Sequence, residues 1–223
     1  FRSEVELEHA IAGDDQNGEI ELEQAYIEFD LNDNTQAKGG LFLVPVGMLN
    51  ETHEPPTFYG VERNPIERVI IPTTWWEGGA ALSGNFGAGW GYDLALHSGL
   101  SSDDFSIRGG RQKVSEADAS DPAVTGRLRW AGVPGVSLGV SSQYQRDITQ
   151  GEGPETPAVL VETHVALERG PLGLRALYAR WDLDSAEAEA IGRDEQYGWY
   201  VEPSWRIAPQ WGVFARYSEW DTK

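Results

Sequence analysis

The sequence predicts an all-β fold, an antiparallel up-and-down β-barrel of which about ten or eleven strands are present. Apolar and polar residues alternate with a period of two along most of the chain, as in "VSLGVSSQYQ", where Val136, Leu138 and Val140 share one face. Helical periodicity is confined to "SAEAEAIG" at 185–192, which is too short to build a helical layer. Short and long joints alternate between these segments, which is typical of a barrel with turns at one rim and loops at the other.

The alternating segments give the strands in chain order. We expect them near 3–12, 19–31, 36–47, 78–87, 90–99, 123–131, 136–147, 157–168, 172–183, 195–207 and 210–220. The segment "DDFSIRGGRQKV" also alternates weakly, but a wall strand there would break the rhythm of short and long joints. We therefore predict a folded-back loop for it.

The joints fall into two classes. The short joints lie near Asp33 and at 87–89, 132–135, 169–173 and 208–210. The long joints lie at 50–79, 99–121, 147–156 and 184–194. Greek-key connections of a β-sandwich would not keep this strict alternation, so the pattern favours a meander.

The composition excludes several classes of protein. The 223 residues carry a formal charge of -19, which repels nucleic acid. There is no Cys, so disulfides and thiolate sites are absent. The sequence contains no run of apolar residues long enough for a transmembrane helix and no HExxH, GxSxG or phosphate-binding loop. We expect no enzyme, no cofactor and no bound metal.

Both ends of the chain read as strands. It opens with "FRSEVELEH" and closes with "ARYSEWDTK", each in an alternating pattern. A count of eleven strands is odd, and an up-and-down bacterial barrel closes with an even number. We predict that 1–223 is a single barrel domain that is incomplete at both ends.

The two faces of the strands predict a transmembrane barrel in the outer membrane of a Gram-negative bacterium. Aromatic residues on the apolar face lie close to the short joints, as an interfacial girdle would: Trp90, Tyr92, Trp130, Trp205 and Trp211. The opposite face is charged, which a dry core would not tolerate but a watery lumen would. The predicted pore-lining residues are Arg127, Arg129, Arg206, Arg216, Asp93 and Glu162, with His97, His164 and Glu202 on the same face. A soluble β fold with a dry core is the alternative.

One stretch resembles a known family. "EQAYIEFDLNDNTQAKGGLFLVPVGMLNETHEPPTFYGVERNPIE" is similar to outer-membrane porins of the phosphate-selective porin O/P family, through its "QAYIEF" and "GGLFLVPVG" strands, the polar turn between them and the following loop. "VFARYSEWD" also looks like the strand of that family that carries a lumenal Arg. The detailed likeness covers 24–84. It implies a barrel of about sixteen strands, often trimeric, with a loop folded into the pore after the fifth strand.

On this resemblance, 50–79 is the candidate constriction loop, and the chain runs from near the third strand to near the thirteenth. Four prolines restrict its backbone, and Tyr59, Trp75 and Trp76 can anchor it to the wall. Opposed charges can create a transverse field in a narrow pore, or they can pair with each other and lock the loop. The candidate residues are Glu51, His53, Glu54, Tyr59, Glu62, Arg63, Glu67, Arg68, Trp75 and Trp76.

The expected function is that of an outer-membrane porin giving passive diffusion of small ions and polar solutes. The wall arginines favour anions or phosphate, or they balance Asp93, Glu162 and Glu202; the constriction loop contains no Lys. The expected partners are outer-membrane lipid, lipopolysaccharide, small ions or solutes and further copies in a homotrimer, with no nucleic acid. Two alternatives remain open. One is a plugged structural barrel whose acidic loops bind lipopolysaccharide or a partner. The other is a soluble carbohydrate-binding β fold with Trp75 and Trp76 as a sugar platform.

Overall fold

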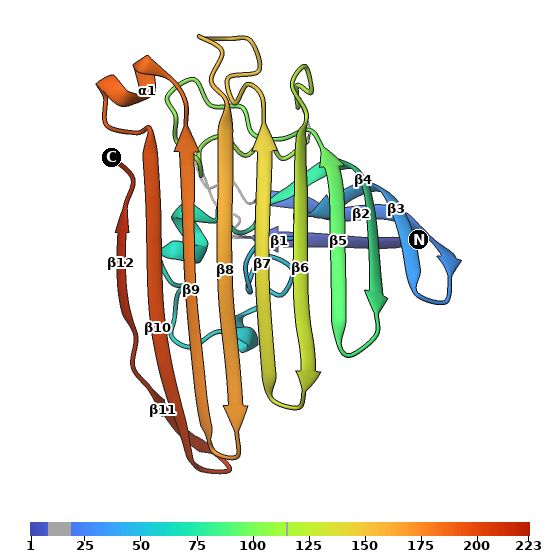
Figure 1. Ribbon diagram of the computed structural model, residues 1–223, viewed down its shortest axis with the longest axis vertical. Coiled ribbons are helices and arrows are strands. Elements are labelled where there is room, and N and C mark those ends of the chain that lie inside the picture. The colour runs from blue at the N-terminus through green and yellow to red at the C-terminus, as the bar shows by residue number, and fades with distance from the viewer. Residues whose placement is uncertain (9–18, 115) are drawn as a thin grey trace, which may run out of the picture.

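The protein is one twelve-stranded antiparallel sheet with its strands in chain order (Figure 1). The structure, a computed structural model, describes residues 1–8, 19–114 and 116–223. The strands are β1 (Arg2–Glu8), β2 (Glu19–Asn32), β3 (Thr35–Leu43), β4 (Trp76–Phe86), β5 (Trp90–His97), β6 (Ala123–Val133), β7 (Val136–Gln145), β8 (Ala158–Arg169), β9 (Leu172–Leu183), β10 (Glu195–Ala208), β11 (Trp211–Phe214) and β12 (Tyr217–Asp221). Three short helices interrupt the loops: η1 (Pro55–Thr57), η2 (Ile66–Ile70) and α1 (Ala186–Ala190). None of the helices in the described ranges is long and apolar enough to cross a membrane.

The predicted antiparallel meander is confirmed, with differences in where some strands begin and end. β3 ends at Leu43 and β4 begins at Trp76, so the predicted third strand is too long and the loop between them is wider than expected. The predicted eleventh strand is two short strands, β11 and β12, and both pair with β10. Of the first predicted strand, the part at 9–12 lies outside the described residues. The segment at 103–114 is a loop, as predicted.

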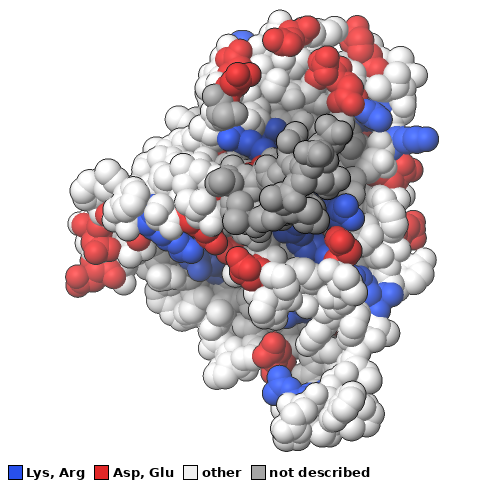
Figure 2. Space-filling view, turned by 180° about the vertical axis from the view of Figure 1, so that it is seen from behind, with Lys and Arg blue, Asp and Glu red and all other residues white. Residues whose placement is uncertain are grey.

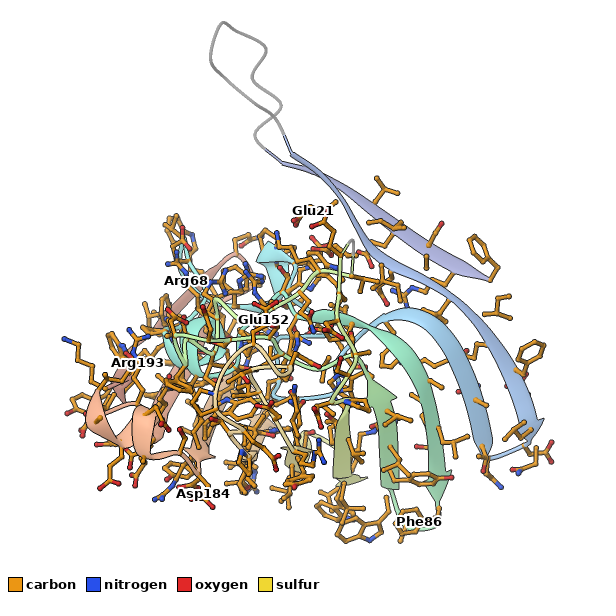
Figure 3. The ribbon with its side chains drawn as sticks, turned by 90° about the horizontal axis from the view of Figure 1, so that it is seen from above. Glu21, Arg68, Phe86, Glu152, Asp184 and Arg193 are labelled. Carbon is orange, nitrogen blue, oxygen red and sulfur yellow. The ribbon has the colours of Figure 1, made fainter. Side chains whose placement is uncertain are left out.

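The sheet is curved but, over the described residues, open. Figure 1 shows the hairpin turns at the lower rim and the long loops at the upper rim, and Figure 3 shows the sheet wrapping around a hollow that the loops enter. The tight turns need unusual backbone conformations. Gly135 has a φ of 77°, which glycine adopts without the clash that a Cβ would cause. The two edges of the sheet are β1 on one side and β11 with β12 on the other.

The strands expose their apolar side and bury their polar side. In β7, Val140 and Tyr144 are 52% and 50% exposed, whereas Ser141, Gln143 and Gln145 between and after them are fully buried. The apolar face is the convex one, because the loops cover the residues of the other face. The same outward apolar set runs through the other wall strands, and includes Ile27, Phe29, Leu82, Leu94, Leu96, Leu128, Val161, Tyr178, Val201 and Trp205. This is the reverse of a water-soluble β protein, in which the apolar face is buried.

The hydrophobic core lies between two loops and the concave face of the sheet. The inner loop, 44–75, packs against β8, β9 and β10, and the second loop, 98–122, packs beside it. The residues of this cluster include Val44, Val46, Ile66, Ile70, Ile71 and Trp75 of the inner loop, Leu100, Phe105 and Ile107 of the second loop, and Leu160, Leu177, Ala179, Trp181 and Tyr200 of the wall. The inner loop is therefore a packed element of the fold.

Asn50 closes the neck of the inner loop. Its Nδ2 donates to the carbonyl oxygens of Val44 and Trp75, each at 2.8 Å, and its Oδ1 accepts from Trp75 N at 2.8 Å. Val44 N also donates to Trp75 O at 3.0 Å. One side chain thus satisfies backbone groups at both ends of the loop, which would otherwise be buried without partners.

Candidate functional site

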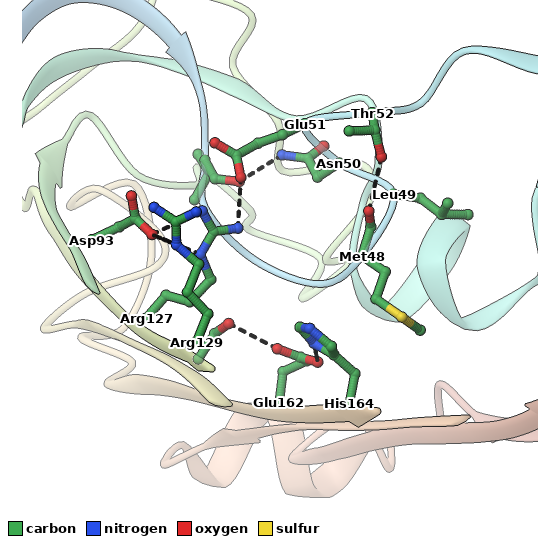
Figure 4. A network of polar contacts seen from close by, with 12 residues as sticks. Met48, Leu49, Asn50, Glu51, Thr52, Asp93, Arg127, Arg129, Glu162 and His164 are labelled. Carbon is green, nitrogen blue, oxygen red and sulfur yellow. Dashed lines mark hydrogen bonds and ion pairs between the residues drawn. The ribbon is translucent and has the colours of Figure 1, made fainter. Parts of the chain in front are cut away.

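The site is the concave side of the sheet with the inner loop seated on it. Figure 4 shows its central network, in which Arg127 of β6 joins the wall to the loop. Arg127 Nη1 lies 2.5 Å from Glu51 Oε2, and its Nη2 lies 2.8 Å from Asp93 Oδ2. Arg129 Nε lies 3.4 Å from the same Asp93 oxygen. The Arg127 and Asp93 side chains are 9% and 10% exposed, and the charge of Arg127 is balanced by its two carboxylate partners. The Arg129 side chain is more accessible to solvent, at 44% exposed.

Glu162 of β8 lies on the concave side of the sheet but is fully buried. Its Oε2 accepts from Ser141 Oγ at 2.7 Å, and its Oε1 lies 2.6 Å from His164 Nδ1. The imidazole lies across Gly139, where a Cβ would come within 2.2 Å of His164 Cε1. The predicted pore-lining carboxylate therefore contacts neighbouring side chains and no solvent.

The predicted residues Arg206 and Arg216 have different surroundings: Arg206 lies near the turn at the end of β10, and Arg216 lies between β11 and β12, beside the middle of β10. Arg216 is paired: its Nε donates to Glu202 Oε2 at 2.6 Å and its Nη2 donates to Tyr59 O at 2.9 Å. Arg206 is exposed and lines a cavity of about 360 Å³ together with Tyr59 and Arg175. The wall arginines thus divide into ion-paired links and more accessible side chains.

Tyr59 attaches the tip of the inner loop to the sheet. Its ring stacks on Phe214 of β11 with centroids 5.1 Å apart, and the guanidinium of Arg175 lies 5.3 Å from the Tyr59 centroid. Arg216 lies 5.8 Å from the Phe214 centroid. Arg175 Nη1 also donates to Thr57 O at 2.8 Å. The contacts join the loop tip to β9, β11 and the segment between β11 and β12 through two aromatic rings and two guanidinium groups.

Glu67 holds the inner loop in place through buried hydrogen bonds. It is fully buried, and its carboxylate accepts from Met48 N at 2.7 Å, Leu49 N at 2.8 Å and Tyr200 OH at 2.8 Å. Asn64 Nδ2 donates to it at 3.0 Å. Burial raises the pKa of Glu67 above its usual value, while these hydrogen bonds act in the opposite direction. For this residue, the four hydrogen bonds favour the second predicted role of the loop charges, which is to lock the loop.

His53 ties the start of the inner loop to β2. Its Nε2 lies 3.0 Å from Glu23 Oε2, and its Nδ1 lies 3.0 Å from Asn50 O. Burial alone would lower the pKa of His53, but the contacts with Glu23 and Asn50 outweigh it and the pKa is raised. Both ring nitrogens face oxygen acceptors, an arrangement that is satisfied by the doubly protonated imidazolium.

Trp75 and Trp76 are buried and offer no platform to a sugar. Trp75 is 0% exposed and its Nε1 donates to Glu77 Oε1 at 3.0 Å. Trp76 is 2% exposed, with Lys113 Nζ 5.5 Å from its ring centroid. The carbohydrate-binding alternative, which requires these two indoles at the surface, is therefore wrong in this respect.

The other charged residues of the inner loop are more accessible. Glu62 and Arg68 lie 3.7 Å apart at the surface. Arg63 lines a cavity of about 160 Å³, together with His53, Glu54 and Glu62. Figure 3 places Arg68 on the open side of the hollow. These residues are the part of the predicted loop that solvent can reach.

Several basic residues of the hollow were missed in the sequence. Arg108, Arg111 and Lys113 belong to the second loop, and Arg175 belongs to β9. The "RGGR" of the second loop indicates a local cluster of basic residues, but the alternating pattern alone does not show which segment of the chain its arginines contact. Figure 2, which faces the hollow side, shows Lys and Arg near the middle of that face and Asp and Glu crowded at the upper rim. The exposed acids of the upper loops include Asp103, Asp104, Asp118, Glu152, Glu155, Asp184, Glu187 and Glu189.

Comparison with known proteins gives a relative without a described activity. No family model matches the sequence. A protein of Aquifex aeolicus (strain VF5), described as an uncharacterized protein, is 35% identical over 149 residues. The match covers 64% of this chain and 34% of that protein, so the chain spans about a third of its relative's length. The resemblance to the phosphate-selective porins stays a prediction.

Proposed function

We propose that the chain forms the wall and the constriction of an outer-membrane channel for the passive diffusion of small ions and polar solutes, with a preference for anions. The observation that carries this proposal is the reversed sidedness of the sheet. An apolar convex face and a polar, charged concave face suit a barrel with lipid outside and water inside. A water-soluble protein of this size rarely exposes so large an apolar surface.

Aromatic residues at the turn rim support the membrane assignment. Phe86 stacks on Trp90 with centroids 6.2 Å apart, and Trp90 lies 6.5 Å from Trp130. Tyr92 lies 6.2 Å from Phe86. These rings gather around two neighbouring hairpin turns, and Figure 3 shows Phe86 on the outside of the sheet. Amphipathic rings concentrate at the level of lipid headgroups, so this cluster fits one interfacial girdle of a barrel.

The proposal requires further strands to close the open edges of the sheet. Backbone N–H and C=O groups have no water to bind within the hydrocarbon layer, so a spanning sheet has to close. In this proposal β1 and the β11–β12 edge pair with additional strands, giving the barrel of about sixteen strands that the resemblance implies. The inner loop then narrows the space between β8–β10 and those strands.

The distribution of charge favours anions inside the channel. Arg63, Arg68, Arg108 and Arg111 come from the two loops in the hollow, while Arg129 and Arg206 are accessible on the wall. The acidic surplus lies largely on exposed loops at the rim. Because a field acts most strongly in a narrow, low-dielectric passage, the arginines of the hollow outweigh the distant carboxylates in setting selectivity.

Single-channel conductance of the full-length protein in planar bilayers tests the proposal. Discrete current steps, with a reversal potential under a salt gradient that favours anions, are the expected result. Cation-favouring steps would retain the channel and discard its anion preference. Correctly inserted protein without conductance would instead indicate the structural barrel, in which the loop core plugs the pore.

A further inference from the structure

The second loop holds the backbone of the inner loop through two arginines. Arg108 Nη1 donates to the carbonyl oxygens of Arg68 and Thr73, each at 2.6 Å. Arg111 Nη1 donates to Thr74 O at 2.6 Å, and its Nε donates to Arg108 O at 3.2 Å. Arg68 lies in η2, whereas Thr73 and Thr74 lie in the irregular segment that returns the inner loop to β4. The two guanidinium groups supply hydrogen-bond donors to these three carbonyl oxygens.

The second loop is a firm support for these arginines. A β-bridge joins Leu100 to Arg111, and Ser101 N donates to Gly110 O at 2.8 Å. Phe105 and Ile107 are buried in the same core as the inner loop. A side chain that donates from such a fixed base restrains its acceptor more than one on a free loop would, since less ordering entropy is lost.

The same contacts concentrate positive charge. Burial, together with the like charges of Arg111, Arg68 and Arg63, lowers the pKa of Arg108 to about 10. Arg108 therefore stays protonated at neutral pH, and the four guanidinium groups repel one another. Within the part of the chain that the structure describes, neither Arg108 nor Arg111 has a carboxylate ion-pair partner within 4.0 Å. At longer range, the carboxylates of Glu21 and Glu77 favour the charged form of Arg111.

We infer that the constriction is a composite of both loops, in which Arg108 and Arg111 are positioning and specificity-determining residues. Their hydrogen bonds hold the inner loop at Arg68, Thr73 and Thr74, and their charge sets the sign of the preferred ion. This inference rests on the proposed channel and goes beyond it, since it assigns selectivity to a loop other than the one that narrows the pore.

Charge and positioning can be separated with matched variants of the full-length protein in planar bilayers. Arg108→Gln removes the charge and the guanidinium; Arg108→Lys keeps the charge but has a shorter, unforked side chain. Arg108→Gln should lower the anion-to-cation permeability ratio by roughly twofold or more and raise open-channel current noise several-fold. Arg108→Lys should raise the noise with the permeability ratio unchanged. Arg111→Gln and Arg111→Lys should behave in the same way.

Arg146→Gln is the matched control, because Arg146 is a 62% exposed arginine that pairs with Asp121 at the rim. It should change neither quantity. Unchanged noise and permeability in Arg108→Gln and Arg111→Gln would overturn the inference. Equal shifts of the permeability ratio in the Gln and Lys variants would overturn the role of charge.

A second readout works without conductance. Trypsin should cleave the inner loop at Arg63 or Arg68 several-fold faster in Arg108→Gln than in the wild type, with the heat-modifiable gel shift of the folded barrel as the folding check. Unchanged cleavage would contradict the positioning role. A wild type that inserts but does not conduct, combined with faster cleavage in the variant, would refute the proposed function and keep the two-loop contact.

Discussion

Arg127 on strand β6 and Glu51 on the inner loop form an ion pair of 2.5 Å, and Arg127 is shared with Asp93 on the neighbouring strand. The pair joins β6 to the loop between β3 and β4, and neither β3 nor β4 is adjacent to β6 in the sheet. Asp93 and Arg127 are directly opposite each other across β5 and β6. Asp93 and Arg127 thus form an ion pair within the sheet, and Glu51 of the inner loop adds a second carboxylate partner to Arg127.

Glu51→Gln should make the proposed channel more selective for anions and should raise its open-channel current noise. The change removes one negative charge from the hollow and weakens the tie to Arg127, whose charge is still balanced by Asp93. Reversal potentials and open-channel noise measure the two effects. Arg127→Gln should shift selectivity in the opposite direction and cost more stability, since it leaves Asp93 buried without its main partner. The same direction of shift in both variants would contradict an electrostatic role.

Glu67→Ala should destabilise the protein by about 3 kcal/mol, because it leaves buried donors of the inner loop and Tyr200 without their acceptor. Equilibrium unfolding in urea with lipid vesicles measures this free energy. Glu62→Ala is the control: Glu62 is exposed and its only described ion pair is the 3.7 Å contact with Arg68. Its effect should stay within about 0.5 kcal/mol. Equal losses in the two variants would show that Glu67 does not lock the loop.

The strands could be predicted from the sequence because their signal is local. A period of two and short polar turns specify a meander, and in β7 the exposed Val140 and buried Ser141 follow the predicted alternation. The end of β3 was missed, since "LVPVG" continues the apolar pattern after Leu43 while the chain turns into the hollow. Apolar residues there are buried against the loop core instead of facing outward.

The contacts between loops could not be predicted, because they depend on side chains far apart in the sequence. The sequence shows Glu67 and Arg68 as neighbouring charges of one loop. In the structure Glu67 is buried against Tyr200, whereas Arg68 is exposed and gives its carbonyl to Arg108. Both residues lie in η2, which is only five residues long and has a non-helical backbone conformation at Glu67, so the sequence has no sustained periodicity to show which side chain points inward.

His53 should make the attachment of the inner loop depend on pH. Its folded-state pKa is raised above the ordinary value of 6.5 by Glu23 and Asn50, against the effect of burial. A raised pKa means that the charged form is stabilised by folding. The contribution is therefore complete below the unfolded pKa and is lost as the pH rises through the folded pKa.

The unfolding free energy of the wild type, measured from pH 5 to pH 9, should accordingly fall with rising pH by more than that of His53→Gln. The difference between the two curves isolates this residue from the other titrating groups. Arg63 lies near enough to lower the pKa of His53, so Arg63→Gln should move the transition to higher pH. Parallel curves for the wild type and His53→Gln would rule out the imidazolium contact.

Val140→Arg should impair membrane insertion, because Val140 lies on the convex face of a central strand and is 52% exposed. An arginine on the lipid face of a barrel costs about 2–4 kcal/mol near the midplane of the bilayer. Ser137→Arg provides a matched control on the same strand: Ser137 is half-buried on the concave face, where the proposed lumen is wet. Folding yield into lipid vesicles, read by the heat-modifiable gel shift, should fall for Val140→Arg and stay near wild type for Ser137→Arg. If the convex face met water instead of lipid, Val140→Arg would be tolerated, and the assignment of the two faces would have to be reversed.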